Sequence, residues 1–255
     1  MNPMSTARTW MLRFVGVGTF LIMWEVGGRI LGDALFAPLS SVIMIYPEMV
    51  QEYDLFQELS ISMRQLLIGY LLGCTVGVSV GTAMGRSPLI DGLLQPWVSM
   101  LFATSIAALV PLFILLFGFD LAFRVAIVFM STVWYVLLNT YHGARGVDRQ
   151  LLETAKAFNA SPLQTFRLVL LPALYPYILA GMRNGLAHAI RATVIVEMYV
   201  IVGFGGVVFH TGLEVDTAPL IGALLTIMVV GVFLTEVLKG LGRLIAPWYE
   251  RTQRA

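Results

Sequence analysis

The chain has 255 residues, of which 58% are hydrophobic and only 12% charged, and its net charge is +1. Since a soluble domain carries roughly 25% charged residues, and the apolar residues here come in long blocks, the composition indicates a membrane protein. The near-neutral charge gives no bulk attraction for nucleic acid, and the single Cys74 excludes a disulfide framework and a cysteine-based metal site.

Six apolar segments are each long enough to cross a bilayer, which takes about 20 residues. No small-residue cleavage site follows the first, so we expect a retained span and not a signal peptide. The segment 32–62 has room only for a short helix and a connection. We therefore expect an all-α polytopic membrane protein with one transmembrane domain, residues 1–255, and spans at 12–31, 64–85, 93–117, 121–141, 176–202 and 218–240.

The connecting segments predict the orientation, because Lys and Arg accumulate on the cytoplasmic side of a membrane. The segments 32–62 and 203–217 contain carboxylates and neither Lys nor Arg, so we expect them outside. Arg29, Arg64 and Arg124 lie at outer helix ends, where a long side chain can reach the interface. Both termini are then cytoplasmic, together with Arg8, Arg13, Arg86, Arg145, Arg149, Lys156, Arg167, Lys239, Arg243, Arg251 and Arg254.

Two patterns within the spans predict how the helices pack. Glycines recur every four residues in the second span, and small residues at this spacing let two membrane helices approach closely. We expect a buried seam between helices, a sliding contact being the alternative. Pro96 and Pro111 each remove a backbone donor, so we expect them to bend the third span. The glycines of the seam are Gly69, Gly73, Gly77, Gly81 and Gly85.

A polar interruption, residues 142–172, separates the fourth and fifth spans on the expected cytoplasmic side. Asp148 predicts a helix start, and the apolar stripe that ends at Phe158 predicts an amphipathic helix. Asn159 tolerates the left-handed conformation that closes helices. Ser161, Pro162 and Gln164 then form a capping-box pattern for a second helix. Pro172 and Pro176 mark the expected return to the membrane.

The residue pattern of this interruption resembles the signature loop of permease subunits in binding-protein-dependent ABC importers. Glu153-Thr154-Ala155, Asn159-Ala160 and a Leu-Pro that ends at Pro172 follow the family pattern, with Thr154 and Asn159 in place of its Ala and Gly. The stretches 37–42, 108–120, 171–186 and 246–248 also fit, and together they resemble the nitrate, sulfonate and taurine branch. The family's Arg near the start of the second helix is less well matched, because Arg64 and Gln65 compete for that register.

The resemblance implies that this loop is a coupling element that docks on a cytosolic ATPase. It implies a bacterial inner-membrane complex of two permease copies, here a homodimer, with two ATPase copies and an external solute-binding protein. ATP and Mg would bind the ATPase, because this chain has no phosphate-binding loop and needs no cofactor of its own. The expected coupling residues are Glu153, Thr154, Ala155, Lys156, Ala157, Phe158, Asn159, Ala160, Ser161 and Pro162.

The fifth span contains the candidate translocation path. On a helical projection Asn184, His188 and Arg191 form one stripe, and Glu197 lies on a neighbouring face with Arg183. Ionisable groups at bilayer depth are costly, so these side chains should face protein or water. A positive stripe favours an anion such as a sulfonate, taurine, nitrate or carboxylate. Arg183 has the alternative of lying near the cytosolic end and pairing with the loop or with headgroups.

Two other function classes remain as alternatives. A self-contained secondary transporter or channel would have no use for a docking loop, and such proteins usually show inverted repeats. An intramembrane enzyme would need a polar catalytic constellation, and the sequence has no His-Glu-x-x-His, no Gly-x-Ser-x-Gly and no paired aspartates in its spans. We therefore expect a transport subunit with no catalytic or metal-ligating residues.

Overall fold

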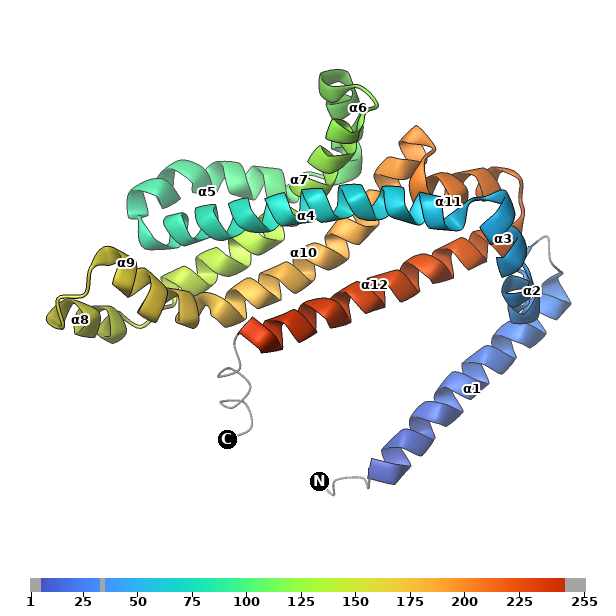
Figure 1. The fold of residues 1–255 in the computed structure, drawn as a ribbon, viewed down its shortest axis with the longest axis horizontal. Helices are drawn as coiled ribbons and strands as arrows, with labels where there is room; N and C mark the ends of the chain where they lie inside the picture. The colour runs from blue at the N-terminus through green and yellow to red at the C-terminus, as the bar shows by residue number, and fades with distance from the viewer. Residues whose placement is uncertain (1–5, 33–34, 246–255) are drawn as a thin grey trace.

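The structure, a computed structural model, describes residues 6–32 and 35–245, and these residues form helices and connections only (Figure 1). Five of the helices are long and apolar enough to cross a membrane, or six spans if the bent pair α5–α6 counts as one. The elements are α1 (Thr6–Leu31), α2 (Leu39–Met44), α3 (Tyr46–Glu52), α4 (Leu55–Arg86), α5 (Pro88–Ala103), α6 (Ile106–Phe117), α7 (Leu121–Arg145), α8 (Arg149–Ala157), α9 (Pro162–Thr165), a π-helical turn (Phe166–Leu170), α10 (Leu171–Val200), α11 (Gly203–Leu213) and α12 (Thr217–Ile245).

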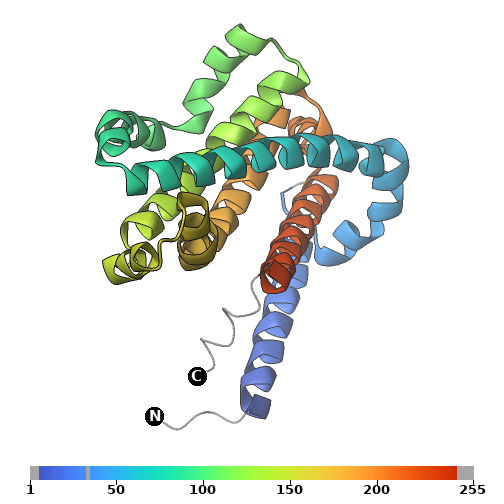
Figure 2. The same ribbon diagram turned by 60° about the vertical axis from the view of Figure 1, so that its left-hand side comes forward.

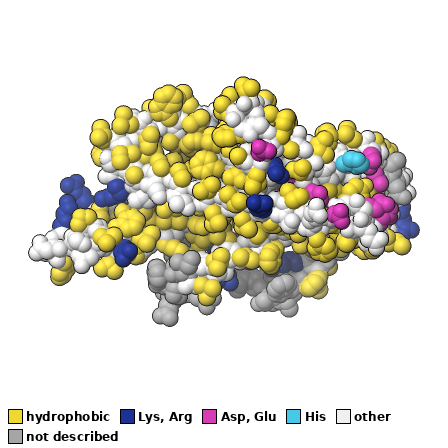
Figure 3. Space-filling model, turned by 45° about the horizontal axis from the view of Figure 1, so that its top comes forward, with side chains coloured by type: hydrophobic (Ala, Val, Ile, Leu, Met, Phe, Trp, Pro, Cys, Tyr) yellow, Lys and Arg dark blue, Asp and Glu magenta, His cyan; other side chains and the backbone are white. Residues whose placement is uncertain are grey.

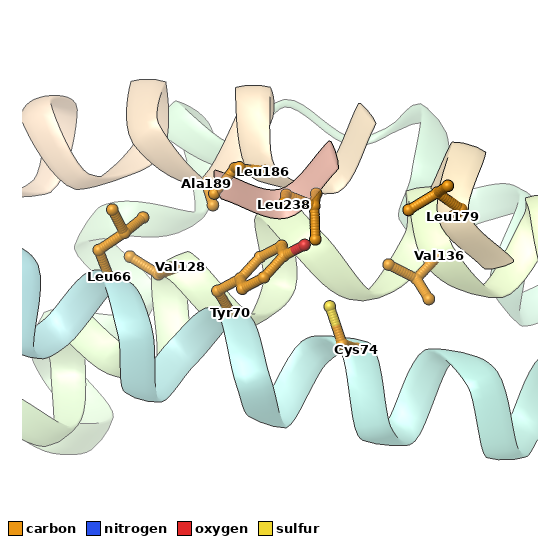
Figure 4. Close-up of a cluster of buried hydrophobic side chains, with 9 residues drawn as sticks. All are labelled: Leu66, Tyr70, Cys74, Val128, Val136, Leu179, Leu186, Ala189 and Leu238. Atoms are coloured by element: carbon orange, nitrogen blue, oxygen red, sulfur yellow. The ribbon is translucent and has the colours of Figure 1, made fainter. Parts of the chain in front are cut away.

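The centre of the molecule is the packing of α4, α7 and α10, with α12 beside them (Figure 1). A cluster of buried apolar side chains from these four helices fills the space between them (Figure 4). Tyr70 of α4 lies in this cluster and donates its hydroxyl to the backbone oxygen of Met182 on α10, at 3.0 Å. The bond satisfies a polar group that would otherwise be stranded among apolar neighbours.

The glycine pattern of α4 forms the predicted buried seam, because the five glycines face α7. A Cβ added at Gly69 would lie 2.7 Å from Val128 Cβ, and one added at Gly81 would lie 2.5 Å from the backbone oxygen of Leu137. Contacts that short do not occur, so any side chain here would force the two helices apart. The absence of side chains lets the α4 and α7 backbones approach closely along residues 69–85 of α4.

The third expected span, 93–117, is not one helix. It is divided into α5 and α6, which are bent by 104° at a break between them. The prediction that Pro96 and Pro111 bend the span was wrong in position, since both prolines lie inside helices. Thr104 and Ser105 take extended backbone conformations instead, and the Thr104 hydroxyl donates to Met100 O. Such a bond offers the backbone an alternative to continuing the helix.

Three other boundaries differ from the sequence prediction. The second span starts at Leu55 instead of 64, because the polar first turns of α4 continue the helix. The fifth begins at Leu171, since Pro172 stands in the first turn and the π-helical turn before it links α10 to α9 without a break. The segment 203–217, expected as a connection, contains the buried helix α11, which packs on α10, α4 and α12.

The first helix differs from the others in having few partners. In the turned view of Figure 2, as in Figure 1, α1 extends away from the bundle, and its span has only 6% of its residues buried. It is attached at one end, where Trp24 donates to Ala37 O at 3.1 Å and Glu25 accepts bonds from Ser40. The stretch 246–248, one of those that carry the family resemblance, lies outside the described residues.

Charged side chains gather at the two ends of the molecule. In Figure 3 a group of Lys and Arg lies at the end that holds α8, with others nearer the middle, and most Asp and Glu lie towards the opposite end, with a histidine. The surface between them is mainly apolar. This distribution matches a protein whose apolar middle lies in a bilayer and whose ends reach water.

Candidate functional site

The coupling loop, residues 142–172, has the local structure that its sequence predicts. Asp148 caps α8 by accepting the Gln150 N–H at 2.9 Å. Asn159 takes a left-handed conformation, with φ of 51°. The side chain of Ser161 accepts the Gln164 N–H at 3.3 Å, and the Gln164 side chain accepts the Ser161 N–H at 2.8 Å. These bonds complete the capping box and fix two short helices at an angle set by Asn159.

The exposed side of this loop is partly apolar. Phe158 is 82% exposed and Leu151 is 50% exposed, although both belong to the stripe that an amphipathic helix would turn towards its own protein. Glu153 is exposed and forms a surface pair with Arg149 at 3.0 Å. Large apolar side chains next to charges on a stiff projection form a surface suited to another protein.

Ala155 is the exception among the predicted coupling residues. It is only 8% exposed, and its backbone oxygen accepts the Ala160 N–H at 3.0 Å. The interpretation of its side chain as part of the docking face is not supported, because it packs within this chain. A larger or charged residue at 155 would disturb the loop itself before it disturbed any partner.

A cleft of about 830 Å³ separates the loop from the ends of α4 and α7. Its lining includes four cationic side chains and one carboxylate, Arg86, Arg145, Arg149, Lys156 and Glu153. Arg145 lies 3.7 Å from Asp91 of α5, and Arg86 donates to Ala144 O at 3.4 Å. The cleft therefore separates the charged face of α8 from the ends of α4 and α7.

The predicted stripe on α10 lies on one side of that helix. Asn184 and Arg191 are exposed and His188 is half-buried. His188 stacks on Tyr135 of α7, with ring centroids 3.8 Å apart and planes at 15°, and Phe102 of α5 meets Tyr135 edge-on at 5.5 Å. An aromatic row from three helices thus lies beside Arg191 on α10, and Phe102 and Tyr135 are members that the sequence did not single out.

Glu197 does not belong to this stripe. It is fully buried, and its carboxylate accepts bonds from Gln65 Nε2 at 2.5 Å and from the Gly205 N–H at 2.8 Å. Ser62 completes the network by accepting the Phe204 N–H at 3.0 Å. The placement of Glu197 on the translocation path is not supported by this geometry. It joins α4, α10 and the start of α11.

The same network explains the register that the sequence left open. Gln65, and not Arg64, faces Glu197, and Ser62 stands one turn earlier on the same side of α4. Neither Ser62 nor Gln65 was predicted, because a polar residue in the first turns of a span looks like part of the polar end. The signal that was available is their spacing of three, which places both on one helical face.

The third part of the Glu197 network, the turn into α11, requires glycine at two positions. Gly203 has φ of 65°, and a Cβ there would collide with the Glu197 carboxylate. At Gly205 a Cβ would collide with Val194 O and lie 2.5 Å from Glu197 Cβ. The glycine-rich stretch after Glu197 therefore serves to bring backbone N–H groups to the carboxylate.

Arg183, the remaining charged residue of the predicted region, is exposed on α10. Its charge acts on Glu236 of α12, which also binds Lys239. It precedes Asn184 by one residue and therefore points roughly 100° away from the stripe around α10. The structure thus brings Asn184, His188 and Arg191 together and leaves Arg183 and Glu197 outside that group.

Comparison with known proteins places the chain in a family. Residues 69–251 match the binding-protein-dependent transport system inner membrane component family. An ABC transporter permease protein of Brucella abortus is 29% identical over 94% of this chain and 98% of its own length. A Bacillus subtilis permease named for aliphatic sulfonates is 31% identical over 74% of this chain and 69% of its own. The taurine transport permease of Escherichia coli is 25% identical over 94% and 91%. The chain belongs to the permease subunits of binding-protein-dependent ABC importers, of the nitrate, sulfonate and taurine type.

Proposed function

We propose that this chain is one half of the membrane channel of an ATP-driven importer that carries a small organic or inorganic anion across the bacterial inner membrane. An external binding protein delivers the solute, and two cytosolic ATPase copies bind ATP and Mg and supply the energy. The observation that carries the proposal is the coupling loop: a capped pair of short helices with Phe158 and Leu151 exposed beside Glu153. A self-contained transporter has no use for such a projection.

The proposed orientation puts the coupling loop and both termini in the cytoplasm. The loop end of the bundle carries Arg and Lys side chains, namely Arg86, Arg145, Arg149, Lys156 and Arg167. The other end carries carboxylates, namely Glu48, Glu52, Asp54, Glu58, Glu214 and Asp216. The excess of Lys and Arg on the cytoplasmic side of bacterial membrane proteins supports this direction.

The α10 stripe supports both the homodimer and the charge of the solute. An arginine facing lipid at the bilayer centre costs about 2.5–3.5 kcal/mol. Arg191 and Asn184 are nevertheless exposed in the single chain. A second copy of the chain placed against this side would enclose the stripe in a shared, water-filled path. Its cationic group would then attract an anion, and the row of His188, Tyr135 and Phe102 would accommodate an apolar body attached to it.

The coupling assignment is tested by Glu153→Arg in the complete importer reconstituted in liposomes. We expect the variant to insert normally and to lose ATP-driven uptake, because the charge at the docking surface is reversed. Arg167→Glu is a matched control that reverses a charge in the loop outside the predicted coupling residues. Normal uptake by Glu153→Arg would contradict the docking proposal.

The path assignment is tested by Arg191→Ala and His188→Ala in the same assay, with ATPase binding checked first. We expect both to lower uptake of anions, Arg191→Ala by about tenfold or more if a charged hydrogen bond to the solute is lost. Arg183→Ala is the control, because it removes an arginine from the same helix outside the stripe. Unchanged uptake of nitrate, taurine and aliphatic sulfonates in both variants would leave the stripe as packing.

A further inference from the structure

Two arginines outside the α10 stripe lie near the outer end of α7 in the proposed orientation. Arg124, in the first turn of α7, and Arg64, in the third turn of α4, line a cavity of about 180 Å³ together with Ile61, Leu121 and Val202. Since a water molecule takes up roughly 30 Å³ in the liquid, the cavity has room for a small solute.

Arg124 has donors that the rest of the structure does not use. Its Nε and Nη1 are buried and have no hydrogen-bond partner among the described residues. A guanidinium carries five N–H donors and stays charged, so buried N–H groups without an acceptor cost free energy. Such a group is expected to have an acceptor in the working protein.

The nearby carboxylates do not supply that acceptor. In residues 6–32 and 35–245, no Asp or Glu forms an ion pair with Arg64 or Arg124. Asp120 stands four residues before Arg124 and is exposed without binding it. The charge of Arg124 does act on Glu197, but that carboxylate is already held by Gln65, Ser62 and Gly205.

The walls of the cavity suit an anion with a small polar head. Ile61, Leu121 and Val202 are apolar, and they reduce the access of water that would compete for the guanidinium donors. Two arginines from different helices can bind one oxyanion through several parallel N–H···O bonds. Val202 also lies in the turn between α10 and α11, next to the Glu197 network.

We propose that Arg64 and Arg124 form an outer anion site that binds the oxyanion head of a solute, such as a sulfonate, nitrate or carboxylate, before it reaches the α10 stripe. The inference deepens the proposed function and rests on it for the identity of the ligand as solute. A phosphate group of a lipid headgroup has the same chemistry and is the other source of such an anion.

The first experiment measures binding and needs no transport. The full-length chain in nanodiscs of phosphatidylcholine is heated in increasing methanesulfonate or nitrate, with choline chloride added to keep ionic strength constant. We expect a saturable rise of Tm in the wild type, because a ligand that binds the folded state raises its stability. Arg64→Gln and Arg124→Gln should each weaken the apparent affinity by about tenfold. Arg183→Gln is the control and should bind as the wild type does.

A second arm separates solute from lipid. The same variants are purified from membranes that contain phosphatidylglycerol, and retained lipid is measured by native mass spectrometry. Retention of phosphatidylglycerol by the wild type but not by Arg124→Gln would support the oxyanion site and identify a headgroup as its occupant. No saturable shift with either anion, together with equal lipid retention in all variants, would overturn the proposal.

The transport assay keeps this inference separate from the proposed function. We expect Arg124→Gln to raise the KM for uptake while kcat and ATPase binding stay near wild type, with Arg124→Lys between the two. ATP-driven uptake with unchanged KM in Arg64→Gln and Arg124→Gln would overturn the outer site and leave the importer intact. Absence of ATP-driven uptake in the wild type would overturn the proposed function, whereas the Tm and lipid results would still decide the site.

Discussion

The coupling loop and the Glu197 network are both polar structures in an apolar protein, but they are held in different ways. Within residues 148–164 of the loop, the side-chain hydrogen bonds join residues two to four positions apart, as in Asp148 with Gln150 and Ser161 with Gln164. In the network, Gln65 and Glu197 are 132 residues apart and meet only because α4 packs on α10. The loop is therefore exposed and locally fixed, whereas the network is buried and depends on the whole bundle.

This difference has an energetic consequence. A bond lost in an exposed loop is replaced by water, so its removal has a modest cost. A partner lost in the network leaves donors without water or acceptor, and each such buried group costs about 1–3 kcal/mol. We expect substitutions in the network to lower the stability of the whole protein, and substitutions in the loop to change local order and coupling.

Glu197→Ala should have the largest effect. It leaves Gln65 Nε2 and the Gly205 N–H without their acceptor, so we expect the free energy of unfolding to fall by about 3 kcal/mol. The measurement is denaturant unfolding of the purified full-length chain in detergent. Glu214→Ala is the control, since that side chain is 51% exposed beside His210 and should change stability by less than about 0.5 kcal/mol. Equal losses in the two variants would mean that the network does not stabilise the fold.

Gly203→Ala should come next. The residue has φ of 65°, which costs a side chain about 1–2 kcal/mol, and its new methyl group would meet the Glu197 carboxylate. We expect a loss of about 2–3 kcal/mol in the same unfolding experiment.

The matched control for this substitution is Gly212→Ala in the same helix α11. Nothing lies within 4 Å of a Cβ at Gly212, and alanine favours helix over glycine. This variant should be neutral or slightly more stable than the wild type. A similar loss in both variants would show that α11 is sensitive to any added side chain, and that the contact with Glu197 is not the reason.

Ser161→Ala should have a smaller and local effect. It removes the acceptor for the Gln164 N–H, and loss of an N-cap costs about 1 kcal/mol. We expect amides of residues 161–166 to exchange hydrogen about fivefold faster, while the unfolding midpoint of the chain hardly moves. Thr154→Ala in the same loop is the control, because its hydroxyl only bonds back to Gln150 O. A large fall in global stability would contradict the local character of the loop.

The same contrast explains what the sequence could predict. The helical class, the approximate places of the apolar spans, the α4–α7 seam and the caps of the loop follow from periodicity, composition and short-range spacing. The structure agrees with these, except that the third span is divided and several boundaries are shifted. The burial of Glu197 against α4 and α11 was not predicted, because a helical projection shows which side a residue takes but not which helix covers that side. Ser62 and Gln65 were missed for the same reason, since their role exists only once α4 meets α10 and α11.

The break between α5 and α6 could not be predicted from proline alone. Proline removes one N–H, yet a span can keep its course when neighbouring turns compensate, as at Pro176 inside α10. The chain bends at Thr104 and Ser105 instead, and threonine and serine are also common in unbroken spans. The aromatic row on the α10 side was also unseen, because Phe102, Tyr135 and His188 come from three separate helices.

The smallest effect is expected for Asn159→Gly, at the point where the loop depends on a left-handed backbone conformation. The residue has φ of 51° and is exposed at the end of α8. Asn159→Gly keeps that conformation at no steric cost, so hydrogen exchange in the loop and ATP-driven uptake should both stay within about twofold of wild type. Asn159→Val is the contrasting variant, since a β-branched residue resists the left-handed region by about 1–2 kcal/mol. It should loosen the turn between α8 and α9 and lower uptake while the bundle stays folded. If glycine uncouples transport as strongly as valine does, then the Asn159 side chain itself contacts the ATPase, and the loop is not fixed by local structure alone.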